Sequence, residues 1–136
     1  MLRKTLLSLF LAMLLYSCSD NAIFSDYHAV HEHQWHQDST YTFSFEVSDT
    51  NHYYDINCLL RIDETYRYSN MYVLYKMTGP NGQSKTVRQN FTVADKNVKW
   101  LGKGYSNIFS YNFTLMKEIS FTSAGTYTIE VAQYMR

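Results

Sequence analysis

Apolar and polar residues alternate along several short segments of the chain. In residues 41–47 the odd positions are apolar and the even positions are polar, and residues 126–131 repeat this alternation. A period of two places the apolar side chains on one face of a β-strand and the polar ones on the other. Threonine, tyrosine, phenylalanine and valine dominate both segments, and these residues fit a pleated, half-buried surface. Each segment therefore predicts a strand with one face in water.

Further strands are predicted between these two segments. Residues 53–62 form a more apolar run, which predicts a more deeply buried strand. Residues 70–93 predict a hairpin, because the sequence Gly-Pro-Asn-Gly at positions 79–82 is typical of a turn. Residues 105–115 and 118–121 are two further strand candidates.

The spacing of these segments predicts the fold class. Turn residues recur about every dozen positions, and no segment after the first twenty residues has a helical period. We therefore expect an all-β protein with an antiparallel β-sandwich, Ig-like or jelly-roll-like, over residues 35–136. A chain of this length can bury a core of its own without disulfides.

The first residues have the pattern of a secretory leader. Arg3 and Lys4 precede a ten-residue apolar stretch, which is too short to span a membrane. The sequence Leu15-Tyr16-Ser17-Cys18 that follows resembles a bacterial lipobox. The resemblance implies acylation of Cys18 and cleavage before it, and the alternative is an ordinary secretory signal with an incidental cysteine. We predict a signal peptide at 1–17 and a lipidated tether at 18–34 whose distal end docks on the domain.

The predicted anchor places the mature chain at a membrane surface outside the cytoplasm. Each buried methylene contributes about 0.8 kcal/mol, and two acyl chains already hold a protein stably on a bilayer. Without the leader the formal charge is near −2, with no clustered basic patch, so nucleic acid is not an expected partner. Cys58 then has no cysteine to pair with and lies in an apolar run, which favours a buried structural thiol.

Candidate metal and catalytic residues are few. Four histidines precede the first predicted strand: His28, His31, His33 and His36. Imidazole binds zinc or copper, but this spacing matches no closed metal site, so solvated linker histidines are the preferred interpretation over a metal-handling lipoprotein. Nothing pairs the available carboxylates Asp55, Asp63, Glu64 and Asp95 across a cleft. We expect neither an enzyme nor a cofactor.

The sequence Trp100-Leu101-Gly102-Lys103-Gly104 predicts a constrained loop. Its glycines suggest backbone angles that other residues cannot adopt. Trp100 is either a partner-binding tip or a plug over one end of the core, and the plug is slightly favoured. Lys99 and Lys103 flank it with charge and are the better candidates for contacting a partner.

Several pieces of the chain together resemble the GldH gliding-motility lipoproteins of the Bacteroidetes. The pieces follow the family's order: Cys18, Trp35, Tyr54-Asp55-Ile56, Arg61, Tyr68-Ser69-Asn70-Met71-Tyr72, Pro80-Asn81-Gly82, Ala94-Asp95, Trp100-Leu101-Gly102-Lys103-Gly104 and Gln133-Tyr134-Met135-Arg136. The resemblance implies an outer-membrane lipoprotein that is an accessory or scaffold component, with partners in the gliding and secretion machinery. Members usually continue past the Met-Arg pair into another strand, so we expect either a truncated product or a member without that strand.

The orientation and the alternative function complete the expectations. Surface export in this phylum is associated with an acidic patch beside the acylated cysteine, and only Asp20 offers a carboxylate here, so we expect the domain to face the periplasm. A carbohydrate- or peptide-binding module on the same sandwich is the alternative, because 13 tyrosines could stack on sugars or supply contact area.

Overall fold

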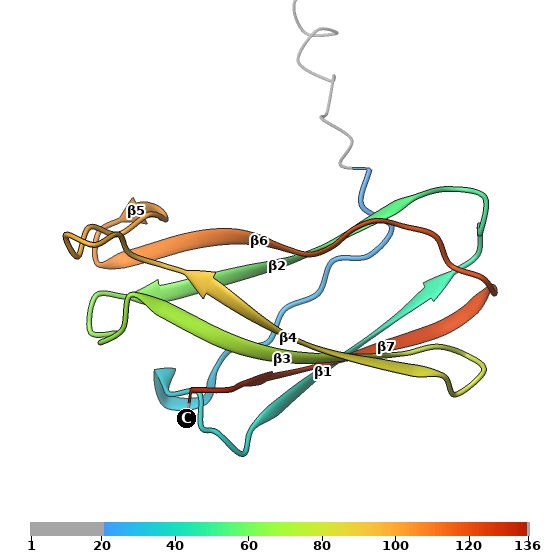
Figure 1. Cartoon of the computed structure of the whole chain (residues 1–136), viewed down its shortest axis with the longest axis horizontal. Coiled ribbons are helices and arrows are strands. Elements are labelled where there is room, and N and C mark those ends of the chain that lie inside the picture. Colours follow the sequence, from blue (N-terminus) through green and yellow to red (C-terminus); the bar gives the residue numbers. More distant parts are fainter. Residues whose placement is uncertain (1–20, 136) are drawn as a thin grey trace, which may run out of the picture.

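The computed structural model of the chain describes residues 21–135 and shows two layers of β-sheet (Figure 1). The described strands are β1 (Thr40–Val47), β2 (Tyr54–Asp63), β3 (Asn70–Thr78), β4 (Ser84–Thr92), β5 (Lys103–Tyr105), β6 (Ile108–Ile119) and β7 (Gly125–Gln133). One short 3₁₀ turn, η1 (His31–His33), precedes them. The two period-two segments of the sequence, residues 41–47 and 126–131, lie within β1 and β7.

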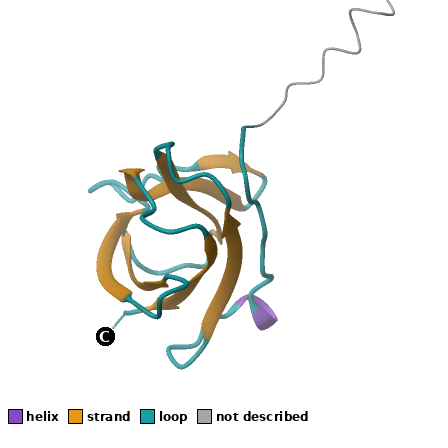
Figure 2. Cartoon of the chain, turned by 90° about the vertical axis from the view of Figure 1, so that its right-hand side faces the viewer, coloured by secondary structure: helices purple, strands orange, loops and turns teal. Residues whose placement is uncertain are grey.

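The strands form one four-stranded and one three-stranded sheet. The order is β1-β7-β3-β4 in the first and β2-β6-β5 in the second, and every pairing is antiparallel. The chain passes from one sheet to the other after β1, β2, β4 and β6. This arrangement confirms the predicted all-β antiparallel sandwich, and the view along the strands in Figure 2 shows the sheets curving around a common interior.

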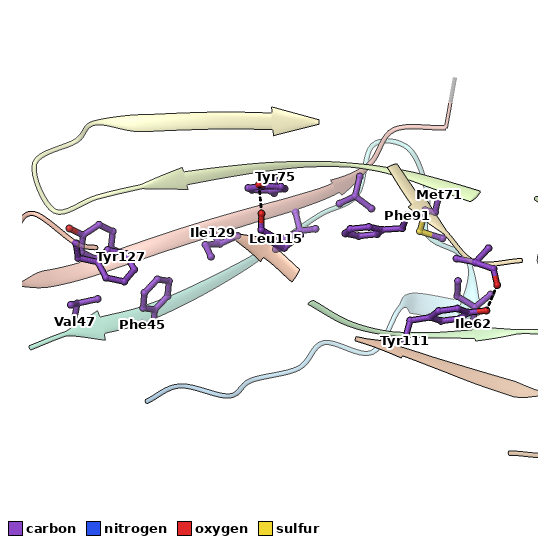
Figure 3. Close-up of a cluster of buried hydrophobic side chains, with 14 residues drawn as sticks. Phe45, Val47, Ile62, Met71, Tyr75, Phe91, Tyr111, Leu115, Tyr127 and Ile129 are labelled. Atoms are coloured by element: carbon purple, nitrogen blue, oxygen red, sulfur yellow. Dashed lines mark hydrogen bonds between the residues drawn. The ribbon is translucent and has the colours of Figure 1, made fainter. Parts of the chain in front are cut away.

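The core fills the space between the sheets. In β7, for example, Tyr127, Ile129 and Val131 are buried, while the alternate residues lie on the outer face. The hydroxyls of two core tyrosines donate hydrogen bonds across the interior. Tyr75 donates to the Leu115 carbonyl at 2.8 Å and Tyr111 to the Val93 carbonyl at 2.7 Å (Figure 3). These bonds matter because an unpaired buried donor costs free energy. Burial also raises the pKa of both hydroxyls.

Strand β2 differs from the expected deeply buried strand. Its residues alternate between more and less exposed positions along the whole strand, and Leu59 is 79% exposed. The reason is its place in the fold, since β2 is an edge strand of a sheet whose outer face no other described element covers. The apolar run of the sequence concealed this period-two pattern.

Strand β6 replaces the two strands expected at 105–115 and 118–121. Tyr105 ends β5, a turn at 106–107 follows, and β6 then runs unbroken for 12 residues. The extra length is accommodated by a bulge opposite β2, where Glu118 has a φ of 50° and its amide donates to the Asp55 side chain at 2.7 Å. A bulge keeps a strand paired while changing which side its residues face, which is why the sequence pattern broke there.

The strand directions define two ends of the sandwich. The proximal end carries the connections 48–53, 79–83 and 120–124, and the distal end carries the connections 64–69, 93–102 and 106–107. Figure 1 shows these groups on opposite sides of the molecule. At about 3.3 Å per residue, strands of this length separate the two ends by about 30 Å.

Candidate functional site

The residues before β1 lie along that strand and form the docked segment, residues 21–39. The ring of Phe24 lies 5.7 Å from that of Phe45, and the ring of His28 lies 4.9 Å from that of Phe43. The segment therefore runs antiparallel to β1, from the proximal towards the distal end, as its blue trace in Figure 1 shows. His28 Nε2 also lies 3.3 Å from the Thr42 carbonyl oxygen, on the open edge of β1.

A cluster of aromatic rings ties the docked segment to the core at the proximal end. Neighbouring centroids within the cluster are 4.6 to 6.0 Å apart, which is within the range of favourable aromatic pairs. The rings are those of Phe24, Phe45, Tyr54, Phe121 and Tyr127. Because Phe45 and Tyr127 belong to one sheet and Tyr54 to the other, the cluster joins the segment to both layers.

Trp35 fixes the other end of the docked segment. Its indole packs edge-on against Tyr41 at 5.6 Å and donates to the Ser39 carbonyl at 3.0 Å. The Gln133 amide, at the end of β7, donates to the Trp35 carbonyl at 3.3 Å. The segment is thus held by side-chain contacts at both of its ends, although it adds no strand to the sheet.

The sequence did not reveal how far this docking extends. Contacts with the domain reach back to Phe24, six residues after Cys18, whereas the sequence predicted a tether up to residue 34 with contacts near its distal end. The segment has no hydrophobic period because single aromatic rings, rather than a continuous face, make its contacts. Cys18 itself lies outside the described residues.

The loop that carries Trp100 is tightly hydrogen-bonded. The Asp95 side chain accepts from the backbone amides of Asn97 at 2.8 Å and Lys99 at 2.9 Å. A bridge between Ala94 and Trp100 closes the loop, and the Leu101 amide donates to the Val93 carbonyl at 3.0 Å. These bonds give the distal end a fixed shape.

Trp100 is half-buried and covers the distal end of the core. Its ring stacks on Phe109, with the centroids 5.0 Å apart and the planes at 21°. The glycines that follow are required for space, because a Cβ on Gly102 would lie 2.7 Å from Cζ of Tyr111, and one on Gly104 would lie 3.0 Å from the Phe109 ring. Neither glycine has a positive φ, so the expectation of special backbone angles was wrong here.

The side chains around Trp100 point into solvent. Lys99 and Lys103 are exposed. Lys96, which was not a candidate from the sequence, is exposed as well. None of the three takes part in the ion pairs found between described side chains. Val98 was also missed, yet it is 77% exposed and has a φ of 62°. Nothing in a sequence marks a valine in the left-handed region, because β-branched residues rarely adopt it.

The histidines and Cys58 lie in separate surroundings. His28 packs on β1, His31 lies 3.7 Å from a Glu32 oxygen, and residues 21–135 contain no group of three metal-ligating side chains. Cys58 is half-buried on the inner side of β2, where burial raises its thiol pKa. A thiol is a poorer nucleophile when its pKa is high, which fits the expected structural role.

The candidate carboxylates are apart and already engaged. Asp55 accepts from the Glu118 amide at the proximal end, whereas Asp63, at the distal end of β2, accepts from Thr65. The Thr65 bonds lower the Asp63 pKa. Asp95 holds the Trp100 loop. Among the open hollows on the surface of the described residues are one of about 240 Å³ beside Phe121 and one of about 530 Å³ beside Leu101.

Comparisons with known proteins identify the family. A sequence model of the GldH lipoprotein family matches residues 22–136. The chain belongs to the GldH lipoprotein family. This GldH family member is 27% identical over 128 residues to a gliding motility lipoprotein GldH homolog of Christiangramia forsetii, covering 94% of the chain and 78% of that relative. It is 26% identical over 125 residues to the gliding motility lipoprotein GldH of Flavobacterium johnsoniae, covering 92% and 77%.

The family assignment confirms the resemblance seen in the sequence. No solved structure matches this GldH family member. In its described part, no helix has the length and apolar character needed to cross a bilayer. Most of the pieces that carried the resemblance gather at or near the distal end of the sandwich: Trp35, Arg61, Ser69, Asp95, Trp100 and Gln133.

Proposed function

We propose that this GldH family member is a lipid-anchored, non-enzymatic accessory or scaffold component of the cell envelope that supports gliding motility and its associated protein secretion. The observation that carries the proposal is the family match over residues 22–136, together with the lipobox ending at Cys18. Both relatives are named as gliding motility lipoproteins rather than as enzymes. The signal peptide (1–17), tether (18–34) and domain (35–136) boundaries are part of this proposal.

We further propose an outer-membrane location with the domain facing the periplasm. The support is the single carboxylate, Asp20, beside the acylation site. Proteinase K added to intact cells tests this orientation, because a periplasmic domain is cleaved only after the outer membrane is permeabilised. Cleavage of the domain in intact cells would place it on the cell surface instead.

The distal end carries the proposed contacts with other envelope proteins. Lys99 and Lys103 reach solvent there, while Trp100 stacks on Phe109 and serves mainly to hold the loop. A fixed loop presents its exposed side chains in one arrangement, which lowers the entropy lost on binding.

The decisive experiment combines membrane fractionation with a motility assay. Cys18→Ser is expected to abolish palmitate incorporation and membrane retention while the domain stays folded, because the anchor and the sandwich are separate parts of the chain. A strain that lacks the gene should lose gliding and the secretion on which it depends, and the unaltered gene should restore both. A Cys18→Ser protein that stays in the membrane pellet after a salt wash would refute the lipid anchor.

A further inference from the structure

We infer that the distal loop, residues 95–103, is the docking site for an acidic segment of a partner protein, with Val98 as its apolar centre. This inference rests on the proposed scaffold function and deepens it, because it names the chemistry of the partner. Lys96, Lys99 and Lys103 supply the charge around Val98, and Leu101 supplies a second apolar contact.

Val98 is the first observation. Left-handed backbone crowds a branched Cβ, so a valine at φ 62° raises the energy of the folded state. A residue that is 77% exposed recovers almost none of this energy through burial. Glycine or asparagine would adopt the same angle at lower cost. Strained residues of this kind cluster at sites of function, and an isopropyl group in water at the tip of a fixed loop is suited to burial by a partner.

The charge of the loop is the second observation. Three lysines fall between residues 96 and 103 in a chain whose formal net charge is zero. The one carboxylate of this stretch, Asp95, accepts backbone hydrogen bonds at the base of the loop, so the ammonium groups face outward without carboxylate partners of their own among the described side chains. A local charge of +2 steers an acidic partner towards the loop and fixes its orientation.

The shape beside the loop is the third observation. The hollow of about 530 Å³ lies between Leu101, Lys96 and the start of β3 at Asn70. Leu101 is 56% exposed at its rim. Lipid phosphates would use the lysines but not the two branched apolar side chains, so a polypeptide that carries both carboxylates and an apolar side chain fits the surface better. The membrane that would hold the proposed lipid is a poor occupant, because the docked segment begins at the opposite end of the sandwich.

The melting temperature of the Val98→Gly variant tests whether the backbone strain at Val98 destabilises the folded state. Val98→Gly is expected to raise the melting temperature by about 4 °C, because relief of the strain outweighs the added freedom of the unfolded chain. Ser106→Gly is the matched control: Ser106 is also exposed, has a φ of 56° and lies in a turn at the distal end, but it has no apolar side chain. A melting temperature that does not rise in Val98→Gly would show that Val98 does not strain the folded state.

Site-specific crosslinking in living cells tests the docking itself. The full-length chain carries p-benzoylphenylalanine at position 98, or at position 59 as a control, where Leu59 is equally exposed on the outer face of β2. We expect a protein adduct from position 98 alone, with a crosslinked peptide rich in Asp and Glu. The triple variant Lys96→Glu/Lys99→Glu/Lys103→Glu should lower its yield more than tenfold, whereas the three Lys→Arg replacements and Ser106→Gly should retain it.

Other outcomes overturn the inference. An adduct with lipopolysaccharide, an adduct equal to that from position 59, or a protein adduct that survives the charge reversal would each show that the loop is not an acid-binding site. The motility assay separates this failure from failure of the proposed function. If deletion of the gene abolishes gliding while position 98 gives no specific adduct, the scaffold role stands and only the docking site is refuted.

Discussion

Trp100 illustrates how one side chain can determine the shape of the distal end. Its ring stacks on Phe109, and backbone hydrogen bonds to the Asp95 side chain hold the loop that carries it. Trp100→Ala is expected to lower the free energy of unfolding by about 3 kcal/mol, near the low end for large buried aromatics because Trp100 is only half-buried. Urea unfolding of the purified domain measures this change.

The control for this prediction is the double variant Lys99→Ala/Lys103→Ala. Both side chains are exposed, so the free energy of unfolding should change by less than about 0.5 kcal/mol. An unchanged stability of Trp100→Ala, together with loss of co-purifying envelope proteins, would show that Trp100 is itself a partner contact.

The raised pKa of Tyr66 predicts that the domain loses stability at high pH. Burial, with a smaller contribution from Tyr68, raises the pKa of Tyr66 to about 12. The folded state therefore holds this proton more tightly than the unfolded chain, whose tyrosines titrate near pH 10. The resulting stabilisation is complete below pH 10 and is lost as the pH rises from 10 to 12.

Unfolding measured across this pH window tests the assignment to Tyr66. The free energy of unfolding should fall less steeply in Tyr66→Phe than in the unaltered domain. Tyr105→Phe removes an exposed hydroxyl and should keep the steep fall. Equal slopes in Tyr66→Phe and the unaltered domain would contradict the prediction.

At the level of residues, the sequence predicted which positions matter better than why they matter. It marked Trp100, Lys99 and Lys103, and the structure places the first two in the 93–102 connection and Lys103 at the start of β5, directly after it. It gave the wrong reason for Gly102, because only the fold brings the Tyr111 ring within 2.7 Å of a Cβ at that position. It missed Val98, because a backbone angle imposed by the loop's hydrogen bonds leaves no mark on composition.

The strands themselves were largely predictable. The alternation of residues 41–47 and 126–131 became β1 and β7, which pair directly with each other. The hairpin at residues 70–93 became β3 and β4 with the expected turn between them. The bounds of β6 were not predictable, because a bulge shifts its register against β2. Docking of the distal end of the segment was predicted, but its extent back to Phe24 was not, since ring contacts spaced along a chain have no regular period.

Phe24 should determine whether the docked segment stays in place. Among the described residues its ring contacts that of Phe45 alone, and the residues after it add no backbone ladder to β1. Phe24→Ala is expected to release the first part of the segment, so cleavage after Tyr27 by chymotrypsin should accelerate at least tenfold. Global stability should fall by only about 1 kcal/mol, because the contact lies at the surface end of the core.

Ile23→Ala provides the matched control for Phe24→Ala. Ile23 is a neighbouring apolar residue but is 57% exposed, so its removal should leave the cleavage rate unchanged. Amide exchange along β1 supplies a second readout, since an uncovered edge strand exchanges faster. Equal cleavage rates in both variants would show that Phe24 does not hold the segment.

For the whole molecule, we predict that the docked segment orients the sandwich on the membrane that would hold the proposed lipid. Cys18 precedes Asn21 by three positions, so a lipid on Cys18 would lie within about 11 Å of Asn21, the first residue that the structure describes. We therefore expect the proximal end to lie nearer the bilayer and the distal loop to lie about 30 Å further out.

Energy transfer to an acceptor in the lipid headgroups measures this orientation. Fluorophores at Asn51 and Asn97 form a matched pair, because both residues are exposed and each donates its backbone amide to an aspartate two positions earlier. Transfer from position 51 should be markedly stronger than transfer from position 97 in the acylated protein. Equal transfer from the two positions would show that the docked segment detaches and that the domain tumbles on its tether.

We expect the docked segment also to determine how the molecule responds to mechanical load. A lipid at the proximal end and a partner at the distal end would pull on the sandwich along its strands, so the ladder hydrogen bonds would bear the force together, in shear. The segment would yield first, since ring contacts and single carbonyl bonds hold it. Its release as far as Trp35 would free about a dozen residues, or about 40 Å of chain. The same peptide would then hold the domain in a fixed position at rest and extend under tension, while the core stays folded.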